Sequence, residues 1–437
     1  DANVVEEWAR KFGSIEPLSD GGDASFSCDD IGGRIDKQVP GSILPNTDVN
    51  EKESDIVTVH IISKFMNIRL TDSDSGSFEC VGYAIDLPMH NKTLQFITRE
   101  RIRHNIGDRG KVNLKALMSH RTHGVDNTGN VGVWDSESTL THCLLRGVPV
   151  DGQGLENVTL PFGLDNVLSL ATPFGPQGGD KAGKVLRVVE LGAGMAGLAG
   201  LALFAASQTG LSRNVSMEVL LTDGHPNCVK NNQVCALLTS SIDADDKGHE
   251  DRGNLKTKSN IRSCRLLWKS DQSGAEECAA LTNETSKLFD LCLASDCTHF
   301  QEFHSSLLAT IGRLLRVGGV CVLCQPHRGT SLNRFMRMIQ SVNRKEGEEY
   351  SPLFDLLLLE RHDTKVWNMH KSFLSDNKKH GRQSAQNPNY DPDIHFPLIL
   401  ILKKIREYNE MEDTYLLERH QRERDCILEE EKQPQTS

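Results

Sequence analysis

Short apolar runs alternate with amphipathic segments from about Val185 to the charged end of the chain. The runs are typical of buried strands, and the segments between them of helices with one apolar face. The predicted strands are Val185–Leu191, Met217–Thr222, Ile261–Leu267, Leu288–Ala294, Gly319–Cys324, Leu353–Glu360 and Pro397–Lys403. The predicted helices are Ala196–Gln208, Pro226–Leu238, Gln301–Leu315 and Ser331–Val342. This alternation predicts a doubly wound, Rossmann-like α/β domain with a mainly parallel sheet over residues 185–404.

The N-terminal part of the chain has a different pattern. Residues 1–55 are rich in Gly, Ser and Asp and lack periodicity, so we expect them to be mostly disordered, with a short helix at Val4–Phe12. From Ile56 onward, β-branched and aromatic runs predict a small antiparallel β unit and a lead-in helix within residues 56–146. Its expected strands are Ile56–Ile62, Phe65–Leu70 and Ser77–Ile85.

Two further segments flank the α/β domain. Many glycines and prolines in residues 147–184 predict a loop insertion. Residues 405–437 form a charged tail, in which Glu410–Lys432 has the pattern of a solvated helix.

Composition narrows the possible classes of function. The formal charge of −11 argues against a nucleic-acid-binding surface that covers the whole protein. No run of 18 apolar residues occurs, so we expect no membrane span. The sequence shows no signal-peptide pattern and its 12 cysteines are scattered, so we expect reduced thiols, a cytoplasmic or nuclear location and a monomer. A C-x-x-C pair ending at Cys324 lies in an apolar run without a second pair, so no metal site is expected.

A glycine-rich turn follows the first predicted strand of the α/β domain. The sequence from Val188 to Gly197 is V-V-E-L-G-A-G-M-A-G, with Gly192 and Gly194 at the turn and a helix predicted after Gly197. Glycines let the backbone turn tightly and let a ligand approach, and the start of the helix can face a ligand carboxylate. The pattern alone fits a dinucleotide or S-adenosylmethionine. Glu190, two residues before the first glycine, favours S-adenosylmethionine because it can pair with the amino group.

The ends of the next three strands carry further candidates. Asp223 follows the second strand, where its two oxygens match a ribose diol. It lies 31 residues after Gly192, later than the spacing of roughly 20 that is typical of NAD-binding sites. Trp268 ends the third strand, where it would stack on an adenine or fill the edge of the core. Asp296 ends the fourth strand, at the edge where doubly wound sheets bind ligands.

These residues, together with several sequence blocks, resemble the calmodulin-lysine N-methyltransferase family, within the seven-stranded class I protein-lysine methyltransferases. The blocks are N-T-G-N-V-G-V-W (127–134), the glycine turn, L-L-T-D-G (220–224), A-S-D-C (294–297), R-L-L (313–315) followed by G-G (318–319), P-H-R-G-T-S-L-N-R-F (326–335) and H-F-P-L-I-L-I-L (395–402). The resemblance runs from about Asn67 to Lys404. It implies a seven-stranded sheet with an antiparallel last strand, S-adenosylmethionine as methyl donor and calmodulin, an acidic protein, as acceptor.

The resemblance also implies roles for individual residues. The cofactor site would comprise Trp134, Glu190, Gly192, Gly194, Gly197, Asp223, Trp268 and Ser295. Asp296 would open an Asp-x-x-aromatic motif at the channel for the lysine. Here the chain departs from the family, because His299 stands at the aromatic position and Phe300 follows it. Either the imidazole substitutes for the ring or the strand end shifts by one residue. Asp296, His299 and Phe300 are therefore the candidate catalytic residues.

Three alternatives to calmodulin methylation remain on sequence grounds. The acceptor could be a lysine of another protein, such as an elongation factor or a chaperone. The fold could serve an NAD-dependent oxidoreductase, although Glu190 speaks against it, or a scaffold that binds the cofactor without catalysis. A basic segment at 361–382 would either dock an acidic partner or form a solvated loop.

Overall fold

The computed structural model describes the following parts of the chain: residues 68–70, 78–101, 132–147, 160–173, 184–209, 211, 215–242, 259–284, 288–343, 351–380 and 390–432. The predictions for residues 1–55, including the helix Val4–Phe12, and for the strand Ile56–Ile62 lie outside these ranges.

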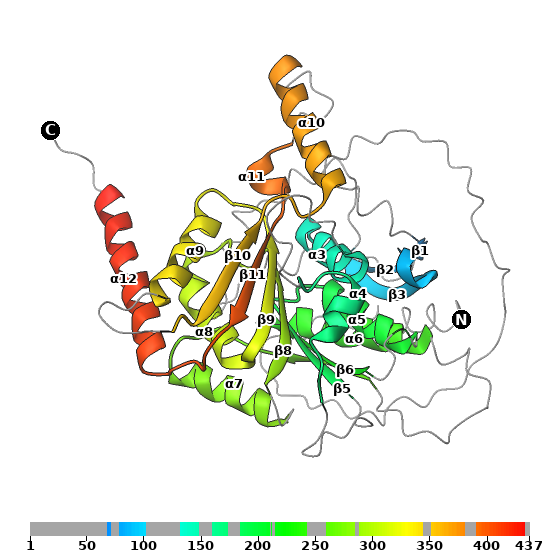
Figure 1. Cartoon of the computed structure of the whole chain (residues 1–437), viewed down its shortest axis with the longest axis horizontal. Coiled ribbons are helices and arrows are strands. Elements are labelled where there is room, and N and C mark those ends of the chain that lie inside the picture. The colour runs from blue at the N-terminus through cyan, green and yellow to red at the C-terminus, as the bar shows by residue number, and fades with distance from the viewer. Residues whose placement is uncertain are drawn as a thin grey trace.

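One large sheet organises the molecule (Figure 1). Its principal strands are β5 (Lys184–Leu191), β6 (Val215–Asp223), β7 (Asn260–Arg265), β8 (Phe289–Ser295), β9 (Leu315–Gln325), β10 (Phe354–Leu359) and β11 (Leu398–Lys404). Their order is β10-β11-β9-β8-β5-β6-β7, and the short β4 (Thr172–Pro173) pairs with β5 as an eighth strand. β5 to β9 are mutually parallel, whereas β11 runs antiparallel to both neighbours. The predicted doubly wound sheet with an antiparallel last strand is confirmed.

Helices cover both faces of this sheet. Figure 1 shows α3 (Asp135–Arg146), α5 (Leu198–Gln208) and α6 (Pro226–Ile242) to one side, with α7 (Gln272–Glu284), α8 (His304–Leu314) and α9 (Ser331–Val342) to the other. The central strands between them are mostly apolar and buried, and all seven residues of β8 are buried. Because the chain moves outward from β5 in both directions, the carboxyl ends of β5, β6 and β8 meet at a switch point, where such sheets bind ligands.

The small N-terminal unit is an antiparallel sheet of β1 (Ile68–Leu70), β2 (Phe78–Leu87) and β3 (Lys92–Arg101), with η3 (Pro88–His90) at the turn. The predicted unit is confirmed, although β3 was not expected. β3 docks on α6: the Thr239 hydroxyl donates to Ile97 O (3.0 Å) and accepts from Ile97 N (3.2 Å). The Arg99 guanidinium donates to the Asn231 amide oxygen at 2.9 Å. The unit therefore packs on the helix that follows the second strand of the large sheet.

Other differences from the predictions lie in polar segments. The expected loop at 147–184 contains the α4 helix (Leu164–Ser169) and β4, because Leu164 and Val167 are fully buried. The basic segment forms α10 (Thr364–His380) rather than a loop, followed by α11 (Pro392–His395). α7 was also not predicted, because its sequence is mostly polar and alanine.

The predicted C-terminal helix exists as α12 (Glu412–Lys432), but its start is not solvated. Leu417 and Asp413 are fully buried, and Arg406 forms a two-pronged ion pair with Asp413 at 2.7 Å. The helix packs against α8 and α9, so the expectation of a solvated extension is wrong for its first turns. The many charged residues of α12 made it look solvated in the sequence, because the apolar stripe to which Leu417 belongs is narrow.

Two searches of the described residues gave negative results. No helix there has the length and apolar character that a membrane crossing requires. Within the same residues, His, Cys, Asp and Glu side chains do not gather in groups of three or more that could hold a metal ion.

Candidate functional site

The glycine turn after β5 has the backbone conformation that its sequence predicts. Gly192, Gly194 and Gly197 have φ angles of 61°, 57° and 55°, in the left-handed region that favours glycine. Gly192 also lacks room for a side chain: a Cβ there would lie 2.8 Å from the Cys297 sulfur and 3.2 Å from the Trp268 ring. The turn is therefore enclosed by the ends of two other strands.

Polar side chains from the next strand and helix fix the turn. Asp223 at the end of β6 accepts hydrogen bonds from Gly194 N at 2.9 Å and His225 N at 2.7 Å. On α6, Asn232 donates to Gly194 O at 3.2 Å and Asn231 to Met195 O at 2.6 Å. Both asparagines are buried, and the sequence analysis did not find them. In the sequence, the sign of their role was the occurrence of two successive asparagines in the first turns of the helix that follows Asp223.

Glu190 lies under the turn rather than on its surface. The residue is 1% exposed, and its carboxylate accepts a hydrogen bond from Gly200 N, in the first turn of α5, at 2.8 Å. Burial raises the pKa of this carboxyl from 4.5 to about 7, although the hydrogen bonds from Gly200 and Ala199 lower it. Glu190 thus caps α5 from within the core, and its pairing with a ligand amino group stays a prediction.

Trp268 lies beyond the end of β7, beside the first glycine. Its half-buried ring lies next to Gly192, and the Cys297 thiol, which donates to Leu191 O at 3.3 Å, is the other neighbour of that glycine. The indole is therefore at the carboxyl edge of the sheet, where the predicted stacking on an adenine requires it. The stacking itself stays a prediction.

Two buried polar atoms at adjacent strand ends lack a partner among the described residues. They are the Ser295 hydroxyl at the end of β8 and the Gln325 amide nitrogen at the end of β9. Ser295 is 8% exposed and Gln325 1% exposed. A buried polar group without a hydrogen bond costs about 1–3 kcal/mol, so such groups point to a missing partner. Both groups are at the same edge of the sheet as the glycine turn.

Asp296 is held by the segment that follows β9. The Arg328 guanidinium donates to both carboxylate oxygens of Asp296, and one of these contacts, from Nε to Oδ1, measures 3.2 Å. The guanidinium also lies 5.7 Å from the centre of the Trp134 ring. Asp296 and Arg328 have φ angles of 53° and 49°, a strained conformation for residues with side chains. The sequence predicted Asp296 and Trp134 but not the arginine between them.

The loop after Asp296 is also anchored to the start of α9. Thr298 N donates to the Gln325 side chain at 3.2 Å, and Thr298 O contacts the His304 ring nitrogen at 2.9 Å and accepts from the Ser331 hydroxyl. Beyond it, the His299 and Phe300 rings pack edge to face, with their centres 4.7 Å apart. Phe300 is buried whereas His299 is half-buried. Their catalytic roles, and the choice between them, stay predictions.

Trp134 is at the start of α3, where two reciprocal hydrogen bonds fix it. The backbone N–H of Trp134 donates to the Glu137 carboxylate at 3.0 Å, and the backbone N–H of Glu137 donates to Trp134 O at 3.0 Å. Residues 127–131 of its block lie outside the described residues. The Trp134 ring lies against the Arg328 guanidinium of the Asp296–Arg328 pair. Its contact with a cofactor stays a prediction.

The side chains at this edge suit S-adenosylmethionine. Asp223 supplies a carboxylate at the turn, whose two oxygens match the ribose hydroxyls of the ligand. Trp268 offers an aromatic face beside Gly192, and the unpartnered Ser295 and Gln325 atoms can hydrogen-bond to a ligand.

A known protein is similar to this chain in sequence. A calmodulin-lysine N-methyltransferase from Arabidopsis thaliana is 29% identical to this chain over 280 residues, which are 64% of this chain and 66% of that protein. This chain thus spans slightly less than two thirds of that relative.

Solved structures resemble the fold more distantly. An S-adenosylmethionine-dependent methyltransferase from Methanosarcina mazei has a TM-score of 0.26 at 11% identity, covering 51% of this chain and 93% of that one. A second, from Geobacter sulfurreducens in complex with S-adenosyl-L-homocysteine, has a TM-score of 0.26 at 13% identity. The match covers 50% of this chain and 84% of that one.

The family model described as "Lysine methyltransferase" matches residues 122–342, a span of just over half the chain. It includes α3, the glycine turn, Asp223, the Asp296 loop and α9, and so contains every element of the site described above. The predicted cofactor, S-adenosylmethionine, is therefore confirmed, and the chain belongs to the lysine methyltransferase family.

Proposed function

We propose that this chain transfers a methyl group from S-adenosylmethionine to a lysine side chain of calmodulin. The observation that carries the proposal is the Asp296–Arg328 pair, because Asp296 directly precedes Cys297, whose sulfur lies beside Gly192 of the glycine turn. An acidic side chain at this position suits a lysine acceptor. The 29% identity with a calmodulin-lysine N-methyltransferase supports calmodulin as the acceptor.

The acceptor nitrogen is the main chemical difficulty. A free lysine has a pKa of about 10.4, so only about 0.04% of it is neutral and nucleophilic at pH 7. An isolated carboxylate beside the amine would increase this difficulty, because it favours the ammonium form. In this site the Arg328 guanidinium offsets the charge of Asp296. The pair can therefore orient the amine through a hydrogen bond without strongly stabilising its protonated form.

Positioning then accounts for the rest of the reaction. When bound, S-adenosylmethionine supplies a sulfonium, which is a good leaving group for an in-line displacement. The glycine turn, Asp223 and Trp268 would hold the donor at the carboxyl ends of β5 to β7. Asp296 and the His299–Phe300 pair would hold the lysine at the end of β8. Fixing both reactants in contact supplies much of the rate acceleration in transfers of this kind.

An acidic acceptor needs a local basic surface, since the formal charge of the chain is −11. The basic segment of α10 is the candidate. Arg361 lies 4.7 Å and Lys371 5.9 Å from the centre of the Trp367 ring. His362 does not belong to this surface: it is 1% exposed, and its ring is 2.9 Å from Pro397 O. Burial also lowers its pKa, so it adds no charge near neutral pH.

Methyl transfer from labelled S-adenosylmethionine to a whole-cell extract tests the acceptor. We expect one dominant labelled band, identified as calmodulin by mass spectrometry. A labelled elongation factor or chaperone in place of calmodulin would contradict the proposed acceptor while keeping the chemistry. Bound cofactor without any labelled protein would instead favour a scaffold.

Replacing Lys365, Lys371, Lys378 and Lys379 together by Glu tests the docking surface. We expect the variant to have a higher KM for calmodulin than the wild type. This increase should become smaller at high salt, because the Debye length falls from ~10 Å at 0.1 M to ~3 Å at 1 M and the charges are screened. If the variant has the same KM as the wild type at low salt, calmodulin docks elsewhere.

A further inference from the structure

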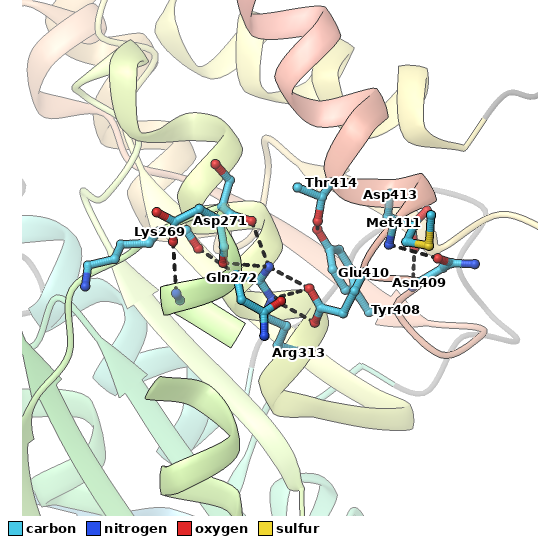
Figure 2. A network of polar contacts seen from close by, with 12 residues as sticks. Lys269, Asp271, Gln272, Arg313, Tyr408, Asn409, Glu410, Met411, Asp413 and Thr414 are labelled. Carbon is cyan, nitrogen blue, oxygen red and sulfur yellow. Dashed lines mark hydrogen bonds and ion pairs between the residues drawn. The ribbon is translucent and has the colours of Figure 1, made fainter. Parts of the chain in front are cut away.

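A buried arginine outside the site binds the segment that follows Trp268. Arg313 on α8 has a side chain only 4% exposed. Its guanidinium donates to three consecutive backbone carbonyls: Lys269 O at 2.7 Å, Ser270 O at 2.8 Å and Asp271 O at 3.4 Å (Figure 2). A guanidinium carries five N–H donors in a fixed plane, so it can fix the path of a loop better than any other side chain.

The C-terminal part of the chain completes this contact. The Glu410 carboxylate accepts from Arg313 Nε at 3.0 Å and from Nη2 at 2.7 Å. The Tyr408 ring lies against the same guanidinium, 5.3 Å from its carbon, and also covers Gly312. The Tyr408 hydroxyl contacts the Thr414 hydroxyl at 2.9 Å, at the start of α12. Figure 2 shows Glu410 and Tyr408 on one side of Arg313 and Lys269 and Asp271 on the other.

Two residues of the bound segment also contact α7. On the far side of Arg313, Asp271 caps α7, accepting from Ser273 Oγ at 2.7 Å and Gly274 N at 3.1 Å. Lys269 forms an ion pair with Glu277 of α7. Trp268 is therefore the last of the three residues between the end of β7 and a segment that Arg313 holds on three successive carbonyls.

We propose that Arg313 and Glu410 are positioning residues for S-adenosylmethionine binding, because they fix the Lys269–Asp271 segment and thereby the Trp268 indole beside Gly192. This inference rests on the proposed function only in placing Trp268 at the cofactor. It assigns a function to the C-terminal extension: residues 405–414 lock the loop that carries the aromatic face of the site.

Glu410→Ala is the most direct test, because this side chain is 47% exposed and its removal leaves no cavity in the core. It leaves the buried Arg313 without its anion. Couplings between sites are typically worth about 5- to 150-fold in affinity, so we expect a Kd for S-adenosylmethionine at least about fivefold higher, measured by calorimetry. Glu423→Ala is the matched control: it breaks an exposed ion pair on α12 with Arg419. It should leave Kd unchanged.

A double-mutant cycle separates positioning from general destabilisation. If Glu410 acts through the indole, Glu410→Ala should change Kd by less than about twofold in a Trp268→Ala background. Equal effects in both backgrounds, or no effect in the wild-type background, would overturn the inference.

Fluorescence provides a readout that does not require the cofactor. Glu410→Ala should shift the tryptophan emission of the unliganded protein, and this shift should vanish when Trp268 is replaced by Ala. A shift that persists without Trp268 would contradict the inference, even if the wild type bound S-adenosylmethionine. Failure of the wild type to bind S-adenosylmethionine would instead overturn the proposed function, and the emission data would still decide whether Glu410 positions Trp268.

Discussion

Glu190→Gln should make the protein more resistant to unfolding at alkaline pH than at acidic pH, relative to the wild type. The buried carboxyl has a pKa raised from 4.5 to about 7, so the folded state binds its proton more tightly than the unfolded state does. Stability therefore falls as pH rises from 4.5 to about 7, because ionisation inside the core is unfavourable. Glutamine keeps an oxygen that can accept from Gly200 N, but it cannot ionise.

The magnitude follows from the two pKa values. At about 1.36 kcal/mol per pH unit, a move from 4.5 to about 7 changes the free energy of unfolding by ~3 kcal/mol in full, and by ~2.5 kcal/mol between pH 5 and pH 8. The difference between variant and wild type at the two pH values cancels contributions that do not depend on pH. The variant should therefore gain roughly 2 to 3 kcal/mol on the wild type between pH 5 and pH 8.

Urea unfolding at both pH values, followed by circular dichroism, measures this difference. Glu423→Gln, which removes an exposed carboxylate on α12, controls for the loss of one negative charge. If the gap between Glu190→Gln and wild type is the same at pH 5 and pH 8, burial does not raise the pKa of this carboxyl, and the reasoning is refuted.

Three further predictions concern the site. Asp223→Ala should raise the Kd for S-adenosylmethionine at least about tenfold in calorimetry, since bonds to a charged acceptor contribute roughly 1.5–3 kcal/mol each; an unchanged Kd in a folded variant would exclude Asp223 from the site. Gly192→Ala should lower the Tm more than Gly329→Ala, because both have positive φ but a Cβ meets other atoms only at Gly192; equal Tm values would refute the crowding. Arg328→Leu should lower kcat and leave the Kd for S-adenosylmethionine within about twofold, because it exposes the acceptor amine to an unpaired carboxylate; an unchanged kcat would contradict this role.

The sequence predicted the large sheet well because its central strands are buried on both faces. Such strands are continuous apolar runs, and Leu398–Lys404 is a clear example. β3 (Lys92–Arg101) was missed because its apolar stretch, Leu94–Ile97, is short and is flanked on both sides by polar and charged residues. α10 was missed because its few apolar residues, such as the pairs Val366–Trp367 and Phe373–Leu374, lie among many charged and polar ones. Charge patterns describe the solvent side of an element, and they hide a narrow apolar stripe.

The candidate site was predicted where local sequence carries the constraint. The glycines and the acids at strand ends have a fixed spacing along the chain, so Asp223 and Asp296 could be located. Asn231, Gln325 and Arg328 could not, because each bonds to a loop that is distant in sequence. The sequence shows that a polar residue is present, whereas only the fold shows which backbone group or carboxylate it meets.

Intact-mass analysis of purified, unmethylated calmodulin is the most direct test of the central claim. Calmodulin would be incubated with this chain and S-adenosylmethionine, and the modified residue located by peptide fragmentation. We predict mass increments of one or more methyl groups on a lysine, which disappear in the Asp223→Ala variant. Unmodified calmodulin, in the presence of wild-type protein shown by calorimetry to bind S-adenosylmethionine, would contradict calmodulin as the substrate.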